Sequence, residues 1–296
     1  MIVVSHGARL KPDNPPNIVK GVEACIENGI LYIEVDLAPL EYGDFILFHD
    51  ERLDRVTNKT GDVFTLDQKV RDDLRYRVER EKASIEVSSL SQIVKLVREK
   101  DGVKELQLDL KVHASSLLDK RILKNLIETI EPVRDSVRIS SCADWIIQKL
   151  HQLDEKLKLG FDPQFYIDSG KRQEAYPPFK RNRFGYLDDH PIAHQRWSSA
   201  SDYLSTRADS LWNIGSYADV WYVRYEFLLE SLSDGFDWVS YLHSKGIKVC
   251  AWTVDLEGET MEDTVDSVLH LKVDRVTTNT PLIWWDMLKM KNVTVK

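Results

Sequence analysis

Short apolar segments alternate with amphipathic segments along the whole chain. Eight apolar segments have the length and composition of strands: residues 2–5, 31–37, 105–112, 137–140, 157–161, 218–227, 247–254 and 275–278. Between them, apolar residues recur at helical spacing in residues 17–28, 91–100, 117–130, 144–153, 236–244 and 260–272. Eight strands alternating with helices predict a parallel α/β architecture. Since no Gly-rich strand-to-helix fingerprint occurs, a closed TIM (β/α)8 barrel is favoured over a dinucleotide-binding sheet.

Two segments interrupt the alternation. Residues 39–84 begin with a hairpin signal, Glu41-Tyr42-Gly43-Asp44, and a return strand at 45–49, and then become polar. Residues 163–217 are rich in Arg, Pro, Ser and aromatic residues and have no clear periodicity. In a barrel, long insertions after strands lie over the catalytic mouth. We therefore predict one domain over residues 1–296, with a small insertion after the second strand and a long loop or insertion at 163–217.

Composition narrows the class of partner. With 43% hydrophobic residues the chain can bury one large core, while its formal net charge of −8 argues against non-specific nucleic-acid binding. No apolar run is long enough to cross a membrane, and no basic leader precedes a long apolar stretch. We expect a cytoplasmic protein with reduced cysteines that acts on a small molecule.

Two of the predicted strands carry charges on one face. Side chains alternate along a strand, so Glu34 and Asp36 share a face opposite aliphatic residues, and Asp109 and Lys111 do the same on the following strand. Buried charges need partners. Two interpretations are open: Asp109 and Lys111 form an internal ion pair with Glu34 exposed, or the three carboxylates bind a cation. All-oxygen ligands favour Mg²⁺, Ca²⁺ or Mn²⁺.

Two histidines follow strands. His6 lies at the carboxyl end of the first apolar strand, and His49 ends the predicted return strand. Barrel enzymes keep their catalytic groups at this end of the strands. A single histidine is more often structural, but two histidines arriving beside carboxylates predict an acid–base site.

These residues form a recognisable set of motifs. They comprise His6-Gly7, Pro15-Pro16-Asn17, Glu34-Val35-Asp36, the stretch from His49-Asp50 to Gly61, Asp109-Leu110-Lys111, and residues 251–255 and 273–281. Together they resemble the glycerophosphodiester phosphodiesterase family, from end to end and weakly between residues 163 and 217. The resemblance implies a TIM barrel that hydrolyses a phosphodiester to a phosphomonoester and an alcohol.

The resemblance also implies residue roles. A divalent cation, Mg²⁺ or Ca²⁺, would lie between Glu34, Asp36 and Asp109. His6 is provisionally the base and His49 the acid, although the sequence does not order them. Attack by a substrate hydroxyl would give a cyclic phosphate.

Two further assignments are left with alternatives. Asp50 either orients His49 or, as we favour, caps its loop. Trp252 either walls the head-group pocket or is a buried core residue.

Several positions depart from the family pattern. Gly7 stands where the family usually has an arginine that contacts the phosphate, and Asp109 stands where Glu is usual. Pro16 and Asn279 replace a Glu and an Asp. Arg224 and Arg9 are candidates to replace the missing arginine, and both also have an ordinary surface or ion-pair interpretation. Lys111 supplies a positive charge in either case.

Alternative functions remain within and outside this family. The substrate could be a lysophospholipid or a sugar phosphodiester, chosen by the segment 163–217 through its aromatic residues or through Arg181 and Arg183. A second alternative is an inactive barrel that binds a phosphate ester, supported by the missing arginine. The two histidines and three carboxylates argue against it, because binding alone needs no acid–base pair.

Overall fold

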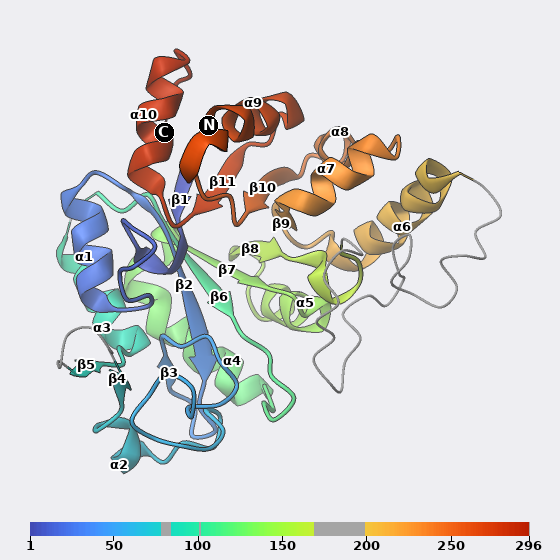
Figure 1. The fold of residues 1–296 in the computed structure, drawn as a ribbon. Coiled ribbons are helices and arrows are strands. Elements are labelled where there is room, and N and C mark those ends of the chain that lie inside the picture. The colour runs from blue at the N-terminus through green and yellow to red at the C-terminus, as the bar shows by residue number, and fades with distance from the viewer. Residues whose placement is uncertain (78–83, 101, 169–198, 296) are drawn as a thin grey trace. The chain divides into compact units, whose positions relative to one another are not determined.

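Eight parallel strands form a closed ring in the computed structural model, which describes residues 1–77, 84–100, 102–168 and 199–295 (Figure 1). The strands are β1 (Ile2–Ser5), β2 (Tyr32–Pro39), β6 (Glu105–Leu110), β7 (Val137–Ser141), β8 (Lys158–Phe161), β9 (Val220–Arg224), β10 (Lys248–Trp252) and β11 (Arg275–Thr278). Their order is β1-β11-β10-β9-β8-β7-β6-β2, and β2 pairs back onto β1 through Ser5 and Ile33. The predicted TIM barrel is confirmed.

The chain divides into two compact units. The N-terminal unit comprises Ser5–Ile139 and Leu153–Leu157, and the C-terminal unit comprises Met1–Val4, Ser140–Gln152 and Lys158–Lys296. Strands β1 and β7 each pass from one unit to the other, so each unit holds a consecutive part of the ring. The single-domain organisation stays a prediction.

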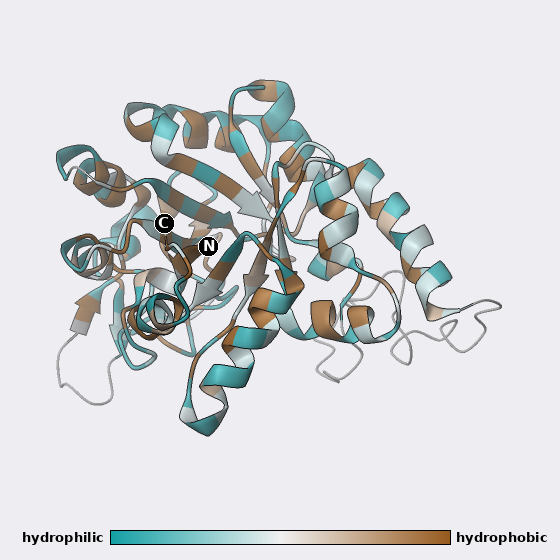
Figure 2. Ribbon diagram, turned by 90° about the horizontal axis from the view of Figure 1, so that it is seen from above, coloured by the Kyte–Doolittle hydropathy of each residue, from teal (hydrophilic) through white to brown (hydrophobic). Residues whose placement is uncertain are grey.

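The N-terminal unit holds the helices α1 (Val19–Glu27), α2 (Gln68–Arg71), α3 (Leu90–Glu99), α4 (Lys120–Ile130) and the 3-10 turn η2 (Glu131–Ser136). Helix α3 begins at a capping box in which Ser89 and Gln92 bond each other's backbone N–H groups. Helix α1 packs against α3 (Figure 1). Hydrophobic and hydrophilic residues alternate in bands along the helices (Figure 2), as expected when one face of each helix is buried.

The predicted insertion at 39–84 folds around a small core of its own. It includes β3 (Phe45–Ile46), antiparallel to β2, and part of the two-stranded sheet of β4 (Arg75–Arg77) and β5 (Ser84–Glu86). The core residues are Ala38, Leu40, Ile46, Phe48, Leu53, Val63, Leu66, Leu74 and Val87. Because Phe48 and Leu53 belong to this core, the residues between them are fixed at both ends.

The C-terminal unit alternates its strands with α6 (Ala200–Gly215), α7 (Tyr225–Ser233), α8 (Trp238–Ser244), α9 (Met261–Leu271) and α10 (Pro281–Met290), while α5 (Asp144–Leu153) follows β7. Three of its tryptophans, Trp221, Trp238 and Trp284, are fully buried. No helix in the described ranges is long and apolar enough to cross a membrane.

Two predicted strands have the wrong bounds. The strand predicted at 218–227 ends at Arg224, where α7 begins, so Glu226 lies on a helix and shares no strand face with Arg224. The mostly aromatic and aliphatic residues at 225–229 suit a strand or a helix. They form a helix here, which buries Phe227 and Leu228. The return strand has two residues instead of five.

The segment 163–217 is partly helical. Helix α6 is capped by Ser199, whose side chain accepts a hydrogen bond from the Asp202 N–H, and it buries Leu204, Ala208, Leu211 and Gly215. This spacing of three and four residues was hidden by polar residues and a glycine on the buried face. The arginines at 181 and 183 and half of the aromatic residues of this segment lie outside the described residues.

Gly160 on β8 is closely packed within the C-terminal unit. A Cβ at this position would lie 2.4 Å from Tyr222 Cε2 and 3.1 Å from Ser140 Cβ. We expect Gly160→Ala to lower the free energy of unfolding by about 1–3 kcal/mol, measured by urea denaturation. In a Tyr222→Ala background the same change should cost less, since the ring is gone. An equal cost in both backgrounds would show that the ring is not responsible.

Candidate active site

A tight turn after β1 presents His6. The chain passes through His6–Ala8 with Gly7 at φ +59°, and the Gly7 N–H donates to Glu34 Oε2 at 2.8 Å. A Cβ on Gly7 would lie 2.9 Å from Pro16 Cβ. Both the left-handed conformation and this contact disfavour a larger side chain at this position. The turn therefore offers a backbone donor to the site where the family pattern has an arginine.

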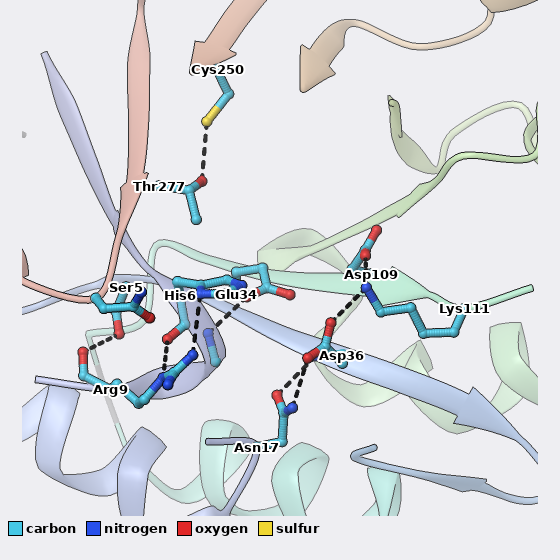
Figure 3. Close-up of polar contacts among 12 residues, drawn as sticks. Ser5, His6, Arg9, Asn17, Glu34, Asp36, Asp109, Lys111, Cys250 and Thr277 are labelled. Carbon is cyan, nitrogen blue, oxygen red and sulfur yellow. Dashed lines mark hydrogen bonds and ion pairs between the residues drawn. The ribbon is translucent and has the colours of Figure 1, made fainter. Parts of the chain in front are cut away.

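Three carboxylates gather on β2 and β6. Asp36 and Asp109 are direct partners in the parallel pairing of these strands, and Glu34 lies two residues before Asp36 on the same face. One ligand oxygen from each of the three lies within 4.8 Å of the others (Figure 3). Glu34 is 4% exposed and Asp36 is 5% exposed, so the interpretation of Glu34 as a surface residue was wrong. Clustered carboxylate oxygens are the donor set that Mg²⁺ or Ca²⁺ prefers.

Lys111 is the cation that contacts this cluster in the structure. Its Nζ lies 2.7 Å from Asp36 Oδ1 and 2.6 Å from Asp109 Oδ2. Burial would lower the pKa of Lys111, but the charges of Asp109, Asp36 and Glu34 raise it well above its usual range. The Asp109–Lys111 ion pair is therefore present together with the carboxylate cluster, and it leaves three acidic groups beside one ammonium.

The carboxylates differ in their electrostatics. Burial, with the charges of Asp36 and Asp109, raises the pKa of Glu34 well above its usual range. Burial would also raise the pKa of Asp36, but Lys111 and then His49 and His6 hold it below its usual range. A further positive charge at the cluster would favour ionised Glu34. The cluster thus fits a divalent cation.

Asn17 holds Asp36 in place, a role that the sequence analysis did not assign. Asn17 Nδ2 donates to Asp36 Oδ2 at 2.7 Å, and Asn17 Oδ1 accepts from the Asp36 N–H at 3.0 Å. The Asn17 N–H donates to the Gly7 carbonyl at 2.8 Å. Asn17 has φ +59° and is 2% exposed. It therefore links the turn after β1 to β2, and the Pro15-Pro16-Asn17 motif was its signal.

His49 is oriented by Asp50. His49 Nδ1 lies 2.9 Å from Asp50 Oδ1, and Arg55 donates to both oxygens of Asp50 at 2.8 Å. Burial raises the pKa of Asp50, but the hydrogen bonds from His49 and Arg55 outweigh it and lower the pKa to about 2. An ionised carboxylate only accepts, so Nδ1 of His49 carries a proton and a neutral ring has its lone pair on Nε2. Asp50 thus contacts His49, as in the orienting interpretation, and also ties the loop to Arg55, as in the loop role that we favoured.

His6 carries the opposite tautomer. Arg9 Nη2 lies 3.3 Å from His6 Nδ1, and a guanidinium only donates. Nδ1 of His6 therefore accepts, and a neutral ring has its proton on Nε2, which lies 3.9 Å from Glu34 Oε2. The structure thus brings His6, His49, the three carboxylates, Lys111 and Arg9 together within the N-terminal unit.

Arg224 and Trp252 belong to the C-terminal unit. Arg224 is 5% exposed and contacts Asp168 Oδ2 at 2.6 Å and Glu226 Oε2 at 3.3 Å. Two carboxylates thus offset its charge, as in the ion-pair interpretation. Trp252 is half-buried and packs on a cluster that contains Tyr222 and Cys250.

The chain is similar to several known phosphodiesterases. A protein from Caldanaerobacter subterraneus subsp. tengcongensis named glycerophosphodiester phosphodiesterase is 25% identical over 163 residues, covering 54% of this chain and 65% of that protein. A glycerophosphodiester phosphodiesterase structure from Parabacteroides distasonis has 13% identity and a TM-score of 0.69, with 98% of each chain covered. A phosphodiesterase of Oleispira antarctica, solved in complex with the product sn-glycerol-3-phosphate, has 14% identity and a TM-score of 0.65, covering 98% of this chain and 96% of that chain.

The fold is a TIM barrel, and its N-terminal unit brings three clustered carboxylates and two histidines together. The model of the Glycerophosphoryl diester phosphodiesterase family matches residues 11–176, more than half of the chain. The chain belongs to this family.

The ion pairs of Asp50 predict a pH effect on stability. Because its folded-state pKa lies below the ordinary 3.8, ionised Asp50 stabilises the fold at higher pH, and this stabilisation is lost as the pH falls toward 2. We therefore expect Asp50→Asn to destabilise the protein near pH 6 and to matter progressively less below about pH 4. Urea denaturation across this range checks it, with exposed Asp13→Asn as the control. A pH-independent difference would contradict the assignment.

Proposed function

We propose that the chain hydrolyses a glycerophosphodiester to a phosphomonoester and an alcohol. The single observation that carries this proposal is the cluster of three carboxylate oxygens within 4.8 Å of one another beside two histidines of opposite tautomer. Membership in the family supports the reaction class. The glycerol phosphate bound to the Oleispira antarctica phosphodiesterase supports a glycerol-like substrate.

One divalent cation, Mg²⁺ or Ca²⁺ with Mn²⁺ as a further option, would be held by Glu34, Asp36 and Asp109. The buried, all-oxygen donor set and its excess negative charge support this. Such an ion supplies Lewis-acid stabilisation of the negative charge that develops on the phosphate. Asp109 is shorter than the glutamate usual in the family, and its position opposite Asp36 keeps it in the cluster.

The histidines divide the proton transfers. His49 has its lone pair on Nε2, and its Nδ1 is hydrogen-bonded to Asp50. It would take the proton of the attacking hydroxyl. His6, as the imidazolium with a proton on Nε2, would give it to the leaving alcohol, and Glu34 at 3.9 Å stabilises that cation. This order reverses the provisional one from the sequence. Attack by a hydroxyl of the substrate forms a cyclic phosphate, which water then opens.

Arg9 is the better candidate for the phosphate contact. It lies 3.3 Å from His6 Nδ1 in the unit that holds the carboxylate cluster, whereas Arg224 is paired with two carboxylates in the C-terminal unit. When His6 takes a second proton, its Nδ1 no longer accepts from Arg9, which leaves the guanidinium able to bind an anionic oxygen. Lys111 adds positive charge beside the cluster, and Trp252 keeps both of its interpretations.

For the substrate, only the chemical class, a glycerophosphodiester, is proposed. Lysophospholipids and sugar phosphodiesters are alternatives whose proposed determinants lie mostly in residues 169–198, outside the described residues. The inactive binding protein stays the second alternative. The cytoplasmic location, the oligomeric state and the absence of nucleic-acid binding stay predictions from the sequence.

Activity and metal dependence can be tested together. We expect phosphomonoester release from a panel of glycerophosphodiesters, a lysophospholipid and sugar phosphodiesters with Mg²⁺ or Ca²⁺, and its loss with EDTA. His6→Ala, His49→Ala and Glu34→Ala should each lower turnover by at least about 100-fold, because each removes a proton-transfer group or a cation ligand. Exposed Glu99→Ala is the control. No turnover from folded, metal-loaded protein would instead favour the inactive binding protein.

The Asn17–Asp36 contact predicts a change in metal affinity. Removing a hydrogen bond that orients a ligand typically weakens metal binding by about 10–100-fold, so we expect this from Asn17→Ala. Mn²⁺ titration followed by electron paramagnetic resonance measures it without turnover. Asn14→Ala, three residues earlier and exposed, should leave the affinity unchanged. Equal metal affinities for the two variants would show that Asn17 does not orient Asp36 for metal binding.

A further inference from the structure

The turn that follows β6 contains two buried polar atoms without a partner. His113 Nε2 and Ser116 Oγ are buried and make no hydrogen bond within the described part of the chain. They belong to one turn, closed by a hydrogen bond of 3.0 Å from the Ser116 N–H to the His113 carbonyl. Leaving such a group unpaired costs about 1–3 kcal/mol. Two such atoms in one turn leave hydrogen-bonding capacity for a partner.

This turn is attached to the segment that carries His49. The N–H and the hydroxyl of Ser115 both donate to Glu51 Oε1, at 3.0 and 3.2 Å. Glu51 lies two residues after His49, between the two ends of a segment fixed by Phe48 and Leu53. The His113–Ser116 turn is therefore held beside the proposed general base.

The surroundings of His113 favour a neutral ligand group. Burial lowers the pKa of His113 to about 4, and the nearby charges acting on it are those of Glu51, Lys111, His49 and Asp50. Glu51 already accepts from Ser115, and Asp50 from His49 and Arg55. Both carboxylates are thus engaged by the protein. A neutral imidazole and a hydroxyl exchange hydrogen bonds with alcohols and offer no charge to attract an ammonium group.

We propose that the His113–Ser116 turn is a subsite for the hydroxyl groups of a polyol, the part of the substrate that stays on the phosphate and carries the attacking hydroxyl. This inference rests on the proposed function, because it places that hydroxyl beside His49. Ser115 positions the turn, and His113 Nε2 and Ser116 Oγ contact the ligand.

Ligand binding tests the subsite without turnover. sn-Glycerol 3-phosphate and propyl phosphate have the same charged group and a similar chain, but only the first has hydroxyls. Calorimetry with the Mg²⁺-loaded protein should give at least about tenfold tighter binding of the glycerol ester, and His113→Ala and Ser116→Ala should each reduce that ratio about fivefold or more. Affinity for propyl phosphate should stay within about twofold, because no hydroxyl contact is lost.

Two further variants separate the subsite from a general effect. His113→Gln places an amide near the position of Nε2 and should restore part of the discrimination, and exposed His270→Ala should leave both affinities unchanged. A ratio that survives His113→Ala and Ser116→Ala, or an equal loss for both ligands, would overturn the subsite. Retained discrimination in a protein that turns over no diester would support the subsite and reject the proposed hydrolysis.

Discussion

The gathering of three carboxylates, two of them buried, on two neighbouring strands is the constraint around which the N-terminal unit is arranged. The parallel register puts Asp36 directly beside Asp109, and alternation puts Glu34 on the same face. Such a concentration of negative charge is unfavourable in a protein interior unless it is compensated. Lys111 compensates two of the groups, the Gly7 N–H a third, and Asn17 fixes the orientation of Asp36. The remaining excess of negative charge distinguishes the cluster from a simple salt bridge and supports the proposed cation site.

The histidines reach this cluster by two different structural means. His6 is placed by a tight backbone turn at the end of a barrel strand. His49 is placed by an insertion that folds on its own apolar cluster, with Phe48 buried immediately before it. Their opposite tautomers come from their neighbours, because Arg9 can only donate and ionised Asp50 can only accept. The protonation pattern of the two histidines is thus set by two residues outside the carboxylate cluster.

The strands of the barrel and the positions of the three carboxylates could be predicted from the sequence, because both follow from local residue patterns. The period of two placed Glu34, Asp36 and Asp109 on inward faces, and the predicted bounds of β1 and β11 are those observed. The helix at 225 was missed because an apolar run suits both elements. The link between Asn17 and Asp36 joins residues 19 positions apart through side-chain hydrogen bonds, which no periodicity encodes. His113 and Ser116 were missed because an unsatisfied polar atom is a property of packing, visible only once its surroundings are known.

The turn at Gly7 also restricts how this site can change. A side chain at position 7 must overcome a left-handed backbone and the Pro16 ring at the same time. Introducing the arginine of the related proteins here is therefore not a single-residue change, because the proline has to move and Asn17 beside it carries the link to Asp36. Positions 7, 16 and 17 are structurally coupled, so transplanting a phosphate-binding arginine between family members would require exchanging the whole segment from 6 to 17.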